Sequence, residues 1–167
     1  MRRLLISGAL GFVVLLLAVC GDSNAPSPAE EAALQRKADL YEIDQIEKKF
    51  HHATTTKDID LMMSLWAPNA TLTAGPAQTA TGIGEIRELW LGSPVFAPAN
   101  QWVSDHPAYK VDITVNGDRG TLHFECHFVD VETSELVLVT VADLDVARIK
   151  ERWLITNLVG GSTSLTP

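Results

Sequence analysis

Basic residues and cysteines are scarce in this sequence. Its 167 residues include 13 lysines and arginines against 21 aspartates and glutamates, and only two cysteines, Cys20 and Cys126. Because the basic residues form no cluster, we expect neither nucleic-acid binding nor electrostatic adhesion to anionic lipid. With so few cysteines, a chain of this length relies on core packing rather than on disulfides for its stability.

The one long apolar run lies at the N-terminus. Arg2 and Arg3 precede roughly fourteen apolar residues (6–19), the length of a secretory signal and short for a membrane span. Without residues 1–19, the chain carries 11 basic and 21 acidic residues, a net charge of −10. The predicted organisation is a signal peptide over 1–19, a flexible tether over 20–30, one domain over 31–160 and a tail over 161–167.

The end of this run, Leu17-Ala18-Val19-Cys20, resembles the lipobox of bacterial lipoproteins. In that family the chain is cut before the cysteine, which is then lipidated. The resemblance therefore implies a cell-envelope protein that meets the membrane only through acyl chains on Cys20. Val19 departs from the usual Gly, Ala or Ser before the cut. Two alternatives remain: cleavage after Cys20, which gives a secreted or periplasmic protein, and an uncleaved anchor.

Three helices are predicted in the first half of the domain. Ser27-Pro28-Ala29-Glu30 combines a capping box with proline at the first helical position, so a helix should begin near Pro28. Three threonines (54–56) should weaken its end, after which Asp58 can cap a second helix that Pro68 ends. The third helix covers 82–90. The apolar stripe of the first helix contains Leu40, Ile43, Ile46, Phe50 and Ala53.

The second half is rich in β-strand patterns. A short strand over 70–73 and an irregular segment over 94–101 come before it, and Asn116-Gly117 predicts a two-residue hairpin turn. The predicted strands of this half cover 102–106, 109–115, 119–130, 136–149 and 153–159. In 119–130, Leu122, Phe124, Cys126 and Phe128 share the buried face, and Thr121, His123, Glu125 and His127 the opposite one. We therefore predict an α+β fold with three helices packed on a strongly curved, mixed, mostly antiparallel sheet.

This order of elements resembles the SnoaL-like branch of the nuclear transport factor 2-like superfamily. The resemblance rests on Lys57-Asp58, on Leu65-Trp66-Ala67-Pro68-Asn69-Ala70, on Thr81-Gly82-Ile83-Gly84-Glu85-Ile86-Arg87, on the hairpin at Asn116-Gly117 and on Arg152-Trp153-Leu154-Ile155. It implies a cone-shaped domain with an internal cavity. The superfamily includes ketosteroid isomerases, scytalone dehydratases, polyketide cyclases and epoxide hydrolases, as well as many non-catalytic members, so the fold alone does not give the function.

The resemblance also implies where catalytic groups would lie. The tyrosine and the proton-abstracting aspartate of the isomerases correspond to Phe50 and Ala74, and the dehydratase aspartate corresponds to Thr55. None of these can serve as a general base. The protonated aspartic acid of the isomerases could correspond to Asp143 or Asp145, with His106 as a nearby imidazole.

Two further patterns have alternative interpretations. If Asp143 and Asp145 line the cavity, burial makes one of them an acid, a base or an anchor; otherwise both are solvated, and Leu144 and Val146 are the buried pair. His123, Glu125 and His127 could bind zinc. Alternatively, they lie on an ordinary polar sheet face that meets solvent or a second subunit.

Two histidines at the end of the first helix, His51 and His52, are also open to two interpretations. One could flank the cavity mouth, although exposed histidines at a helix end need no functional explanation. Cys126, between Phe124 and Phe128, is expected to be buried as a small apolar residue rather than to act as a nucleophile.

The leading hypothesis from the sequence is a non-catalytic module that binds a small, largely apolar molecule, with no cofactor implied. The cavity should be lined by Phe50, Trp66, Leu72 and Trp90, with any polar group supplied by His106, Asp143 or Asp145. The alternatives are a lyase or isomerase that uses Asp143 or Asp145 with His106, and a structural domain that forms a homodimer through the Thr121–His127 sheet face.

Overall fold

A computed structural model describes residues 25–76, 78–104 and 109–164 of the chain. The order of helices and strands confirms the predicted α+β class. The elements are α1 (Pro28–Thr56), α2 (Ile59–Met63), β1 (Trp66–Ala74), β2 (Gln78–Thr81), α3 (Gly82–Leu91), the 3-10 helix η1 (Pro94–Phe96), β3 (Trp102–Val103), β4 (Tyr109–Asn116), β5 (Arg119–Asp130), β6 (Leu136–Ile149) and β7 (Arg152–Ser164). No helix within the described residues is long and apolar enough to cross a bilayer.

The capping box predicted at the start of α1 is present. The Ser27 hydroxyl accepts from the Glu30 backbone N–H, and the Glu30 carboxylate accepts from the Ser27 backbone N–H. The expected weakening over 54–56 does not occur. The hydroxyls of Thr54 and Thr56 donate to carbonyls of the preceding turn, at 2.9 and 2.8 Å, and the helix ends only at Lys57, whose φ is 58°.

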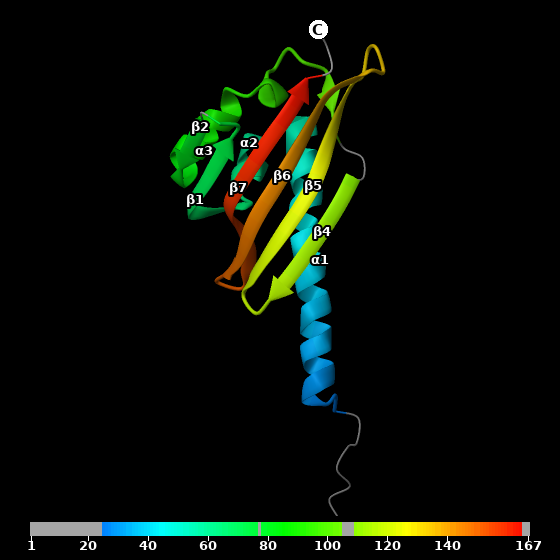
Figure 1. Ribbon diagram of the computed structural model, residues 1–167, viewed down its shortest axis with the longest axis vertical. Helices are drawn as coiled ribbons and strands as arrows, with labels where there is room; N and C mark the ends of the chain where they lie inside the picture. Colours follow the sequence, from blue (N-terminus) through cyan, green and yellow to red (C-terminus); the bar gives the residue numbers. More distant parts are fainter. Residues whose placement is uncertain (1–24, 77, 105–108, 165–167) are drawn as a thin grey trace, which may run out of the picture.

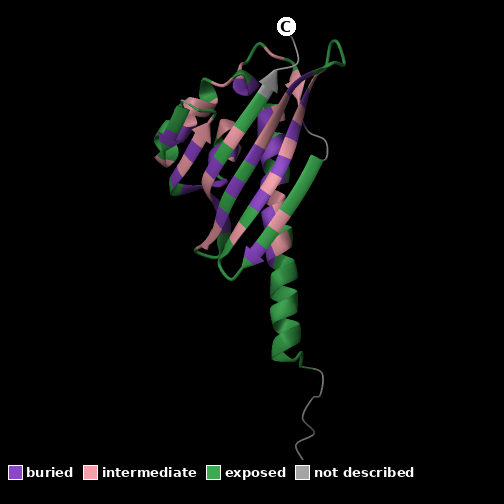
Figure 2. Ribbon diagram, in the orientation of Figure 1, coloured by how far each residue is buried: buried purple, intermediate pink, exposed green. Residues whose placement is uncertain are grey.

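The first part of α1 extends beyond the sheet. Residues 28–38 are all exposed, Arg36 donates to the Val115 carbonyl of β4 at 2.6 Å, and the buried part of α1 begins at Asp39 (Figures 1 and 2). From there the apolar stripe packs across one face of the sheet, with Ile43 and Ala53 fully buried. The first part of α1 therefore projects from the domain, and the rest of the helix belongs to the core.

The second helix is shorter than predicted, and the following strand is longer. Asp58 caps α2 as expected, but α2 ends at Met63, and β1 already begins at Trp66. Pro68 lies inside β1 instead of ending a helix. Since β1 pairs with β7 in parallel and the register shifts between Trp66 and Thr71, the irregular stretch accommodates a residue without a backbone N–H.

The seven strands form one mixed sheet in the order β2-β1-β7-β6-β5-β3, with β4 also paired to β5. Every pairing is antiparallel except that between β1 and β7, so the sheet is mixed and mostly antiparallel, which is the predicted type. The long strands β5, β6 and β7 lie side by side, and α1 runs behind them (Figure 1). The predicted turn after Asn116 is present, with Gly117 at φ 58°.

The two faces of β5 differ as the alternation predicts. Leu122, Phe124, Cys126 and Phe128 are at most 1% exposed and face α1. His123, Glu125 and His127 lie on the outer face and are half-buried. The segment expected to be irregular, 94–101, contains the short helix η1, and β3 consists of only two residues. The core therefore lies between α1, α3 and the inner face of the sheet.

Candidate functional site

The interior of the cone contains a cluster of aromatic rings from four elements. Phe50 of α1 makes edge-to-face contacts with Trp90 of α3 and Phe124 of β5, at centroid distances of 5.3 and 5.4 Å. Trp90 also packs against Phe96 of η1 at 5.8 Å. Edge contacts between rings are favourable, and these four rings pack on one another as part of the hydrophobic core.

The four residues predicted to line the cavity all lie in the interior, at different depths. Phe50, Trp66 and Leu72 are 4%, 2% and 2% exposed, while Trp90 is half-buried. Phe50 and Trp90 touch each other, whereas Trp66 and Leu72 belong to β1, beside β7. Trp90 is therefore the member of this set whose side chain is partly open to solvent.

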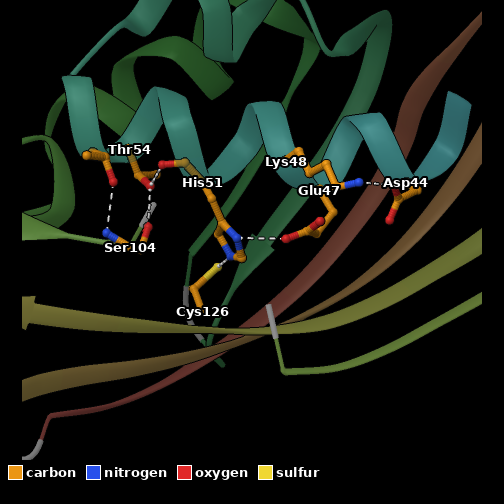
Figure 3. A network of polar contacts seen from close by, with 8 residues as sticks. Asp44, Glu47, Lys48, His51, Thr54, Ser104 and Cys126 are labelled. Atoms are coloured by element: carbon orange, nitrogen blue, oxygen red, sulfur yellow. Dashed lines mark hydrogen bonds and ion pairs between the residues drawn. The ribbon is translucent and has the colours of Figure 1, made fainter. Parts of the chain in front are cut away.

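A chain of polar contacts crosses the interior beside the aromatic cluster. Glu47 and His51 lie one turn apart on α1 and point toward the sheet, where Cys126 of β5 meets the imidazole (Figure 3). His51 Nδ1 is 2.8 Å from Glu47 Oε1, and His51 Nε2 is 2.7 Å from Cys126 Sγ. The Nδ1 contact is an ion-pair distance without the alignment of a regular hydrogen bond. Each of the three residues is at most 3% exposed.

Burial determines the ionisation of the thiol at the end of this chain. It raises the pKa of Cys126 to about 12, and the hydrogen bond from Thr140 offsets only part of that effect. A neutral thiol is a poor nucleophile, so Cys126 acts here as a hydrogen-bonding partner of His51. The prediction that Cys126 is buried and unreactive in character agrees with this placement, but its contact with an imidazole was not foreseen.

Hydroxyl groups join the end of α1 to the segment around β3. Ser104 Oγ lies 2.9 Å from Thr54 Oγ1, and the Ser104 backbone N–H donates to Thr55 Oγ1 at 2.8 Å. Because the Thr54 hydroxyl donates to the His51 carbonyl, the Ser104 hydroxyl is the donor to Thr54. Thr55, where the resemblance places a dehydratase aspartate, is therefore a neutral group that supports the backbone.

The expectation that Asp143 or Asp145 provides a polar group to the cavity is wrong. Both lie on the outer face of β6, and the buried pair is Leu144 and Val146. The register explains this placement, because Asp143 lies opposite His123 on β5, and that face points away from α1. His106, the proposed partner, lies outside the described residues.

On the outer face these carboxylates form a polar surface of their own. His123 Nδ1 contacts Asp143 Oδ1 at 2.7 Å, with side chains 33% and 67% exposed. Asp145 accepts from the Asn157 amide at 3.2 Å, and a hollow of about 470 Å³ lies beside these groups. A second hollow, of about 670 Å³, lies between β2 and α3.

The zinc candidates on β5 are engaged in ion-pair contacts. His123 contacts Asp143, whereas Glu125 is paired with Lys110 at 2.6 Å and lies 3.3 Å from His127. Lys110 and His127 hold the pKa of Glu125 below its usual value. Among the described residues, no three His, Cys, Asp or Glu side chains gather as a metal-binding group. Cys20, the proposed lipidation site, is not among the described residues.

The sequence reasoning missed Glu47 entirely and left His51 undecided. Each lies one position after a residue of the apolar stripe, Ile46 or Phe50, on the edge of the helix face that meets the sheet. Two ionisable residues four apart on that edge were a signal that could have been used. Their contact with Cys126, 75 residues away in the chain, depends on the tertiary structure.

Comparisons with solved structures give the same fold. An NTF2-like protein with a cystatin-like fold from Novosphingobium aromaticivorans has a TM-score of 0.70 and 18% identity, over 82% of this chain and 90% of its own. The hexachlorocyclohexane dehydrochlorinase LinA-type3 from Novosphingobium barchaimii has a TM-score of 0.66 and 18% identity, over 81% and 93%. A proposed dehydratase of the NTF2-like family from Streptomyces avermitilis has a TM-score of 0.61 and 16% identity, over 76% and 97%.

The family assignment rests on sequence as well as on fold. At these identities the structural likeness shows the fold alone. A comparison with curated proteins finds no match. The SnoaL-like domain family, in contrast, matches residues 35–159, which covers the cone and the interior site just described. The chain therefore belongs to the SnoaL-like domain family and has the NTF2-like, cystatin-like fold.

Proposed function

We propose that this chain is an exported SnoaL-like domain that binds a small, largely apolar molecule in its cone without catalysing a reaction on it. The observation that carries the proposal is the aromatic cluster of Phe50, Trp90, Phe96 and Phe124. It lies beside an acid–base pair whose groups already contact one another and are closed to solvent. An aromatic lining with few polar groups favours binding of a flat apolar ligand.

The positions that the family resemblance implies for catalysis carry no catalytic groups, which supports the proposal that the chain binds its ligand without catalysing a reaction. Phe50 carries no hydroxyl, and Thr55 uses its hydroxyl to accept from the Ser104 backbone. Ala74, at the end of β1, lies opposite Gly160 of β7. A general base must reach the proton that it abstracts, and none of these three side chains is a base.

The binding proposal is tested by equilibrium dialysis with 2-ethylnaphthalene, a flat and uncharged probe. We expect saturable binding to the wild-type protein. Phe50→Leu should weaken it about 3- to 10-fold, because it removes ring-edge contacts but keeps an apolar side chain. His123→Ala, on the outer face, is the matched control and should leave the affinity unchanged. Non-saturable uptake, or equal weakening by both variants, would reject binding in the cone.

A second candidate function is an elimination reaction, and the Glu47–His51 pair is the observation that favours it. His51 would remove a proton from a substrate carbon, the C–H electrons would form the new double bond, and a leaving group would depart from the adjacent carbon. Glu47 would stabilise the imidazolium. This reaction requires His51 Nε2 to release Cys126 Sγ. Assays for alkene formation with halogenated or hydroxylated cyclic compounds test it, and His51→Gln should abolish turnover while binding persists.

Export, lipidation and dimer formation remain parts of the proposal. The basic and apolar N-terminal segment and the lipobox-like Leu17-Ala18-Val19-Cys20 support export to the cell envelope with a lipid anchor on Cys20. Cys20→Ser should then release the protein into the soluble fraction. Retention of the variant in the membrane with an intact N-terminus would instead indicate an uncleaved anchor. A homodimer through the outer sheet face would appear in sedimentation velocity as a concentration-dependent species.

A further inference from the structure

We infer that Trp90 determines which molecules the cone accepts, by donating its indole N–H to an acceptor oxygen of the ligand. The ligand class is then a flat, uncharged molecule that carries a carbonyl-type oxygen, rather than a hydrocarbon. This inference rests on the proposed binding function and deepens it. It adds a specific polar contact to a site that is otherwise lined by rings.

The indole of Trp90 packs against two rings and is only partly covered by them. Phe50 contacts it edge-on, with an interplanar angle of 80°, and Phe96 packs against it at 59°. The side chain as a whole is half-buried, so part of it is open to solvent. Its Nε1 atom, however, is shielded from solvent and has no hydrogen-bond acceptor among the described residues.

A shielded indole N–H without an acceptor is an uncommon feature of folded proteins. Buried polar groups nearly always have a hydrogen-bond partner, because loss of water without a replacement is costly. A bound molecule that supplies an acceptor oxygen removes that cost, whereas an isosteric hydrocarbon does not. Sites of this kind discriminate strongly between ligands with and without the matching polar group.

Apart from the indole N–H of Trp66, the polar side chains near Trp90 already contact other groups. Glu47, His51 and Cys126 contact one another, and the hydroxyls of Thr54 and Ser104 form their own hydrogen bond. They therefore have less to gain from a ligand oxygen than the indole of Trp90 has.

A lysine near this cluster also has its hydrogen-bond partners within the protein. Lys57 donates to the carbonyls of Val95 and Trp102, at 2.8 and 3.2 Å, and its partial burial lowers the pKa of its ammonium group. With its hydrogen bonds used in this way, Lys57 holds η1 and β3 against the end of α1. These contacts favour an uncharged acceptor over a carboxylate as the partner of Trp90, because an anion in an apolar site requires a free cation.

Trp66 provides a matched control within the same chain. Its Nε1 atom also lacks an acceptor among the described residues, but its side chain is only 2% exposed and is packed in β1. Removal of this N–H by Trp66→Phe is the same chemical change at a position that is closed to an entering molecule. It should affect ketone and hydrocarbon ligands equally.

The test uses 2-acetylnaphthalene and 2-ethylnaphthalene, which share a ring system and differ in the carbonyl group. Equilibrium dialysis gives the ratio of their affinities for the wild-type protein, Trp90→Phe and Trp66→Phe. We expect the preference for the ketone to fall about 10-fold in Trp90→Phe, the effect of one hydrogen bond, and to persist in Trp66→Phe. An unchanged ratio in Trp90→Phe, or a loss only in Trp66→Phe, would overturn the inference.

A spectroscopic measurement on the wild-type protein does not depend on the stability of a variant. The four tryptophans should give four indole N–H signals in a ¹H–¹⁵N spectrum, and the Trp90 signal can be assigned by through-space contacts to Phe50 or by its loss in Trp90→Phe. The ketone should shift this proton downfield, and the hydrocarbon should not. Equal shifts with both compounds would overturn the inference alone. Failure of both compounds to bind the wild-type protein would overturn the proposed function and the inference together.

Discussion

A histidine–carboxylate contact lies on each side of the sheet, one on α1 over the inner face and one between β5 and β6 on the outer face; the two are nearly equal in length but differ in burial. On the inner side, His51 lies 2.8 Å from Glu47, with both side chains at most 4% exposed. On the outer side, His123 lies 2.7 Å from Asp143, with side chains 33% and 67% exposed. Water screens the outer pair and leaves each partner solvated if the other is removed. If one partner of the inner pair is removed, the other stays buried without water. The distance between two polar groups therefore does not by itself give their contribution to the free energy of unfolding.

The largest difference between the two faces should appear when side chains of β5 are truncated. Phe124→Ala removes a fully buried ring that contacts both Phe50 and His51, and it should destabilise the protein by about 3–5 kcal/mol. His123→Ala, the adjacent residue on the outer face, should change stability by no more than about 0.5 kcal/mol. Urea denaturation followed by circular dichroism measures both. Similar losses would mean that the outer face is buried in an assembly.

A smaller difference should separate the two carboxylates. Glu47→Ala leaves His51 without its buried partner and should cost about 1–3 kcal/mol. Asp143→Ala removes a screened contact and should cost at most about 1 kcal/mol. Double-mutant cycles with His51→Ala and His123→Ala give the coupling free energy of each histidine–carboxylate pair. Addition of 1 M salt should reduce only the coupling free energy of the outer pair, and equal salt sensitivity of both pairs would contradict the comparison.

The smallest effect concerns the alkaline limit of stability. Because burial raises the pKa of Cys126 from 9.0 to about 12, the folded state retains the thiol proton over a range in which the unfolded chain releases it. Stability should therefore fall as the pH rises through that range, by about 1.4 kcal/mol between pH 8 and pH 10. Cys126→Ala should remove this part of the pH dependence of the free energy of unfolding. Denaturant titrations of both proteins at the two pH values measure it, and parallel losses would assign the effect to other groups.

Local patterns predicted the parts of the fold that depend on local chemistry. The period of two along β5 placed Phe124 inside and His123 outside, and the capping box at Ser27 located the start of α1. The sequence predicted the end of α2 less well, because Trp66 enters a parallel pairing with β7, about 90 residues later, which no local pattern encodes.

The candidate site was less predictable than the fold. Both faces of β6 are apolar near Val139 and Val141, so periodicity could not decide where Asp143 points, and the pairing with β5 decided it. The Glu47–His51–Cys126 contacts likewise arise only when α1 packs on β5. The spacing of Glu47 and His51 is visible in α1 alone, but their contact with Cys126 is not.

The exposed first part of α1 has a consequence for how the domain is presented. The exposed helical residues 28–35 precede Arg36, whose guanidinium donates to the Val115 carbonyl of β4, and at 1.5 Å per residue they span about 12 Å. The helix leaves the domain at the end where the β4–β5 and β6–β7 turns lie (Figure 1). With a lipid on Cys20, this helix would act as a spacer that keeps these turns away from the lipid headgroups. The opposite end of the cone, where β7 ends, would then point away from the membrane.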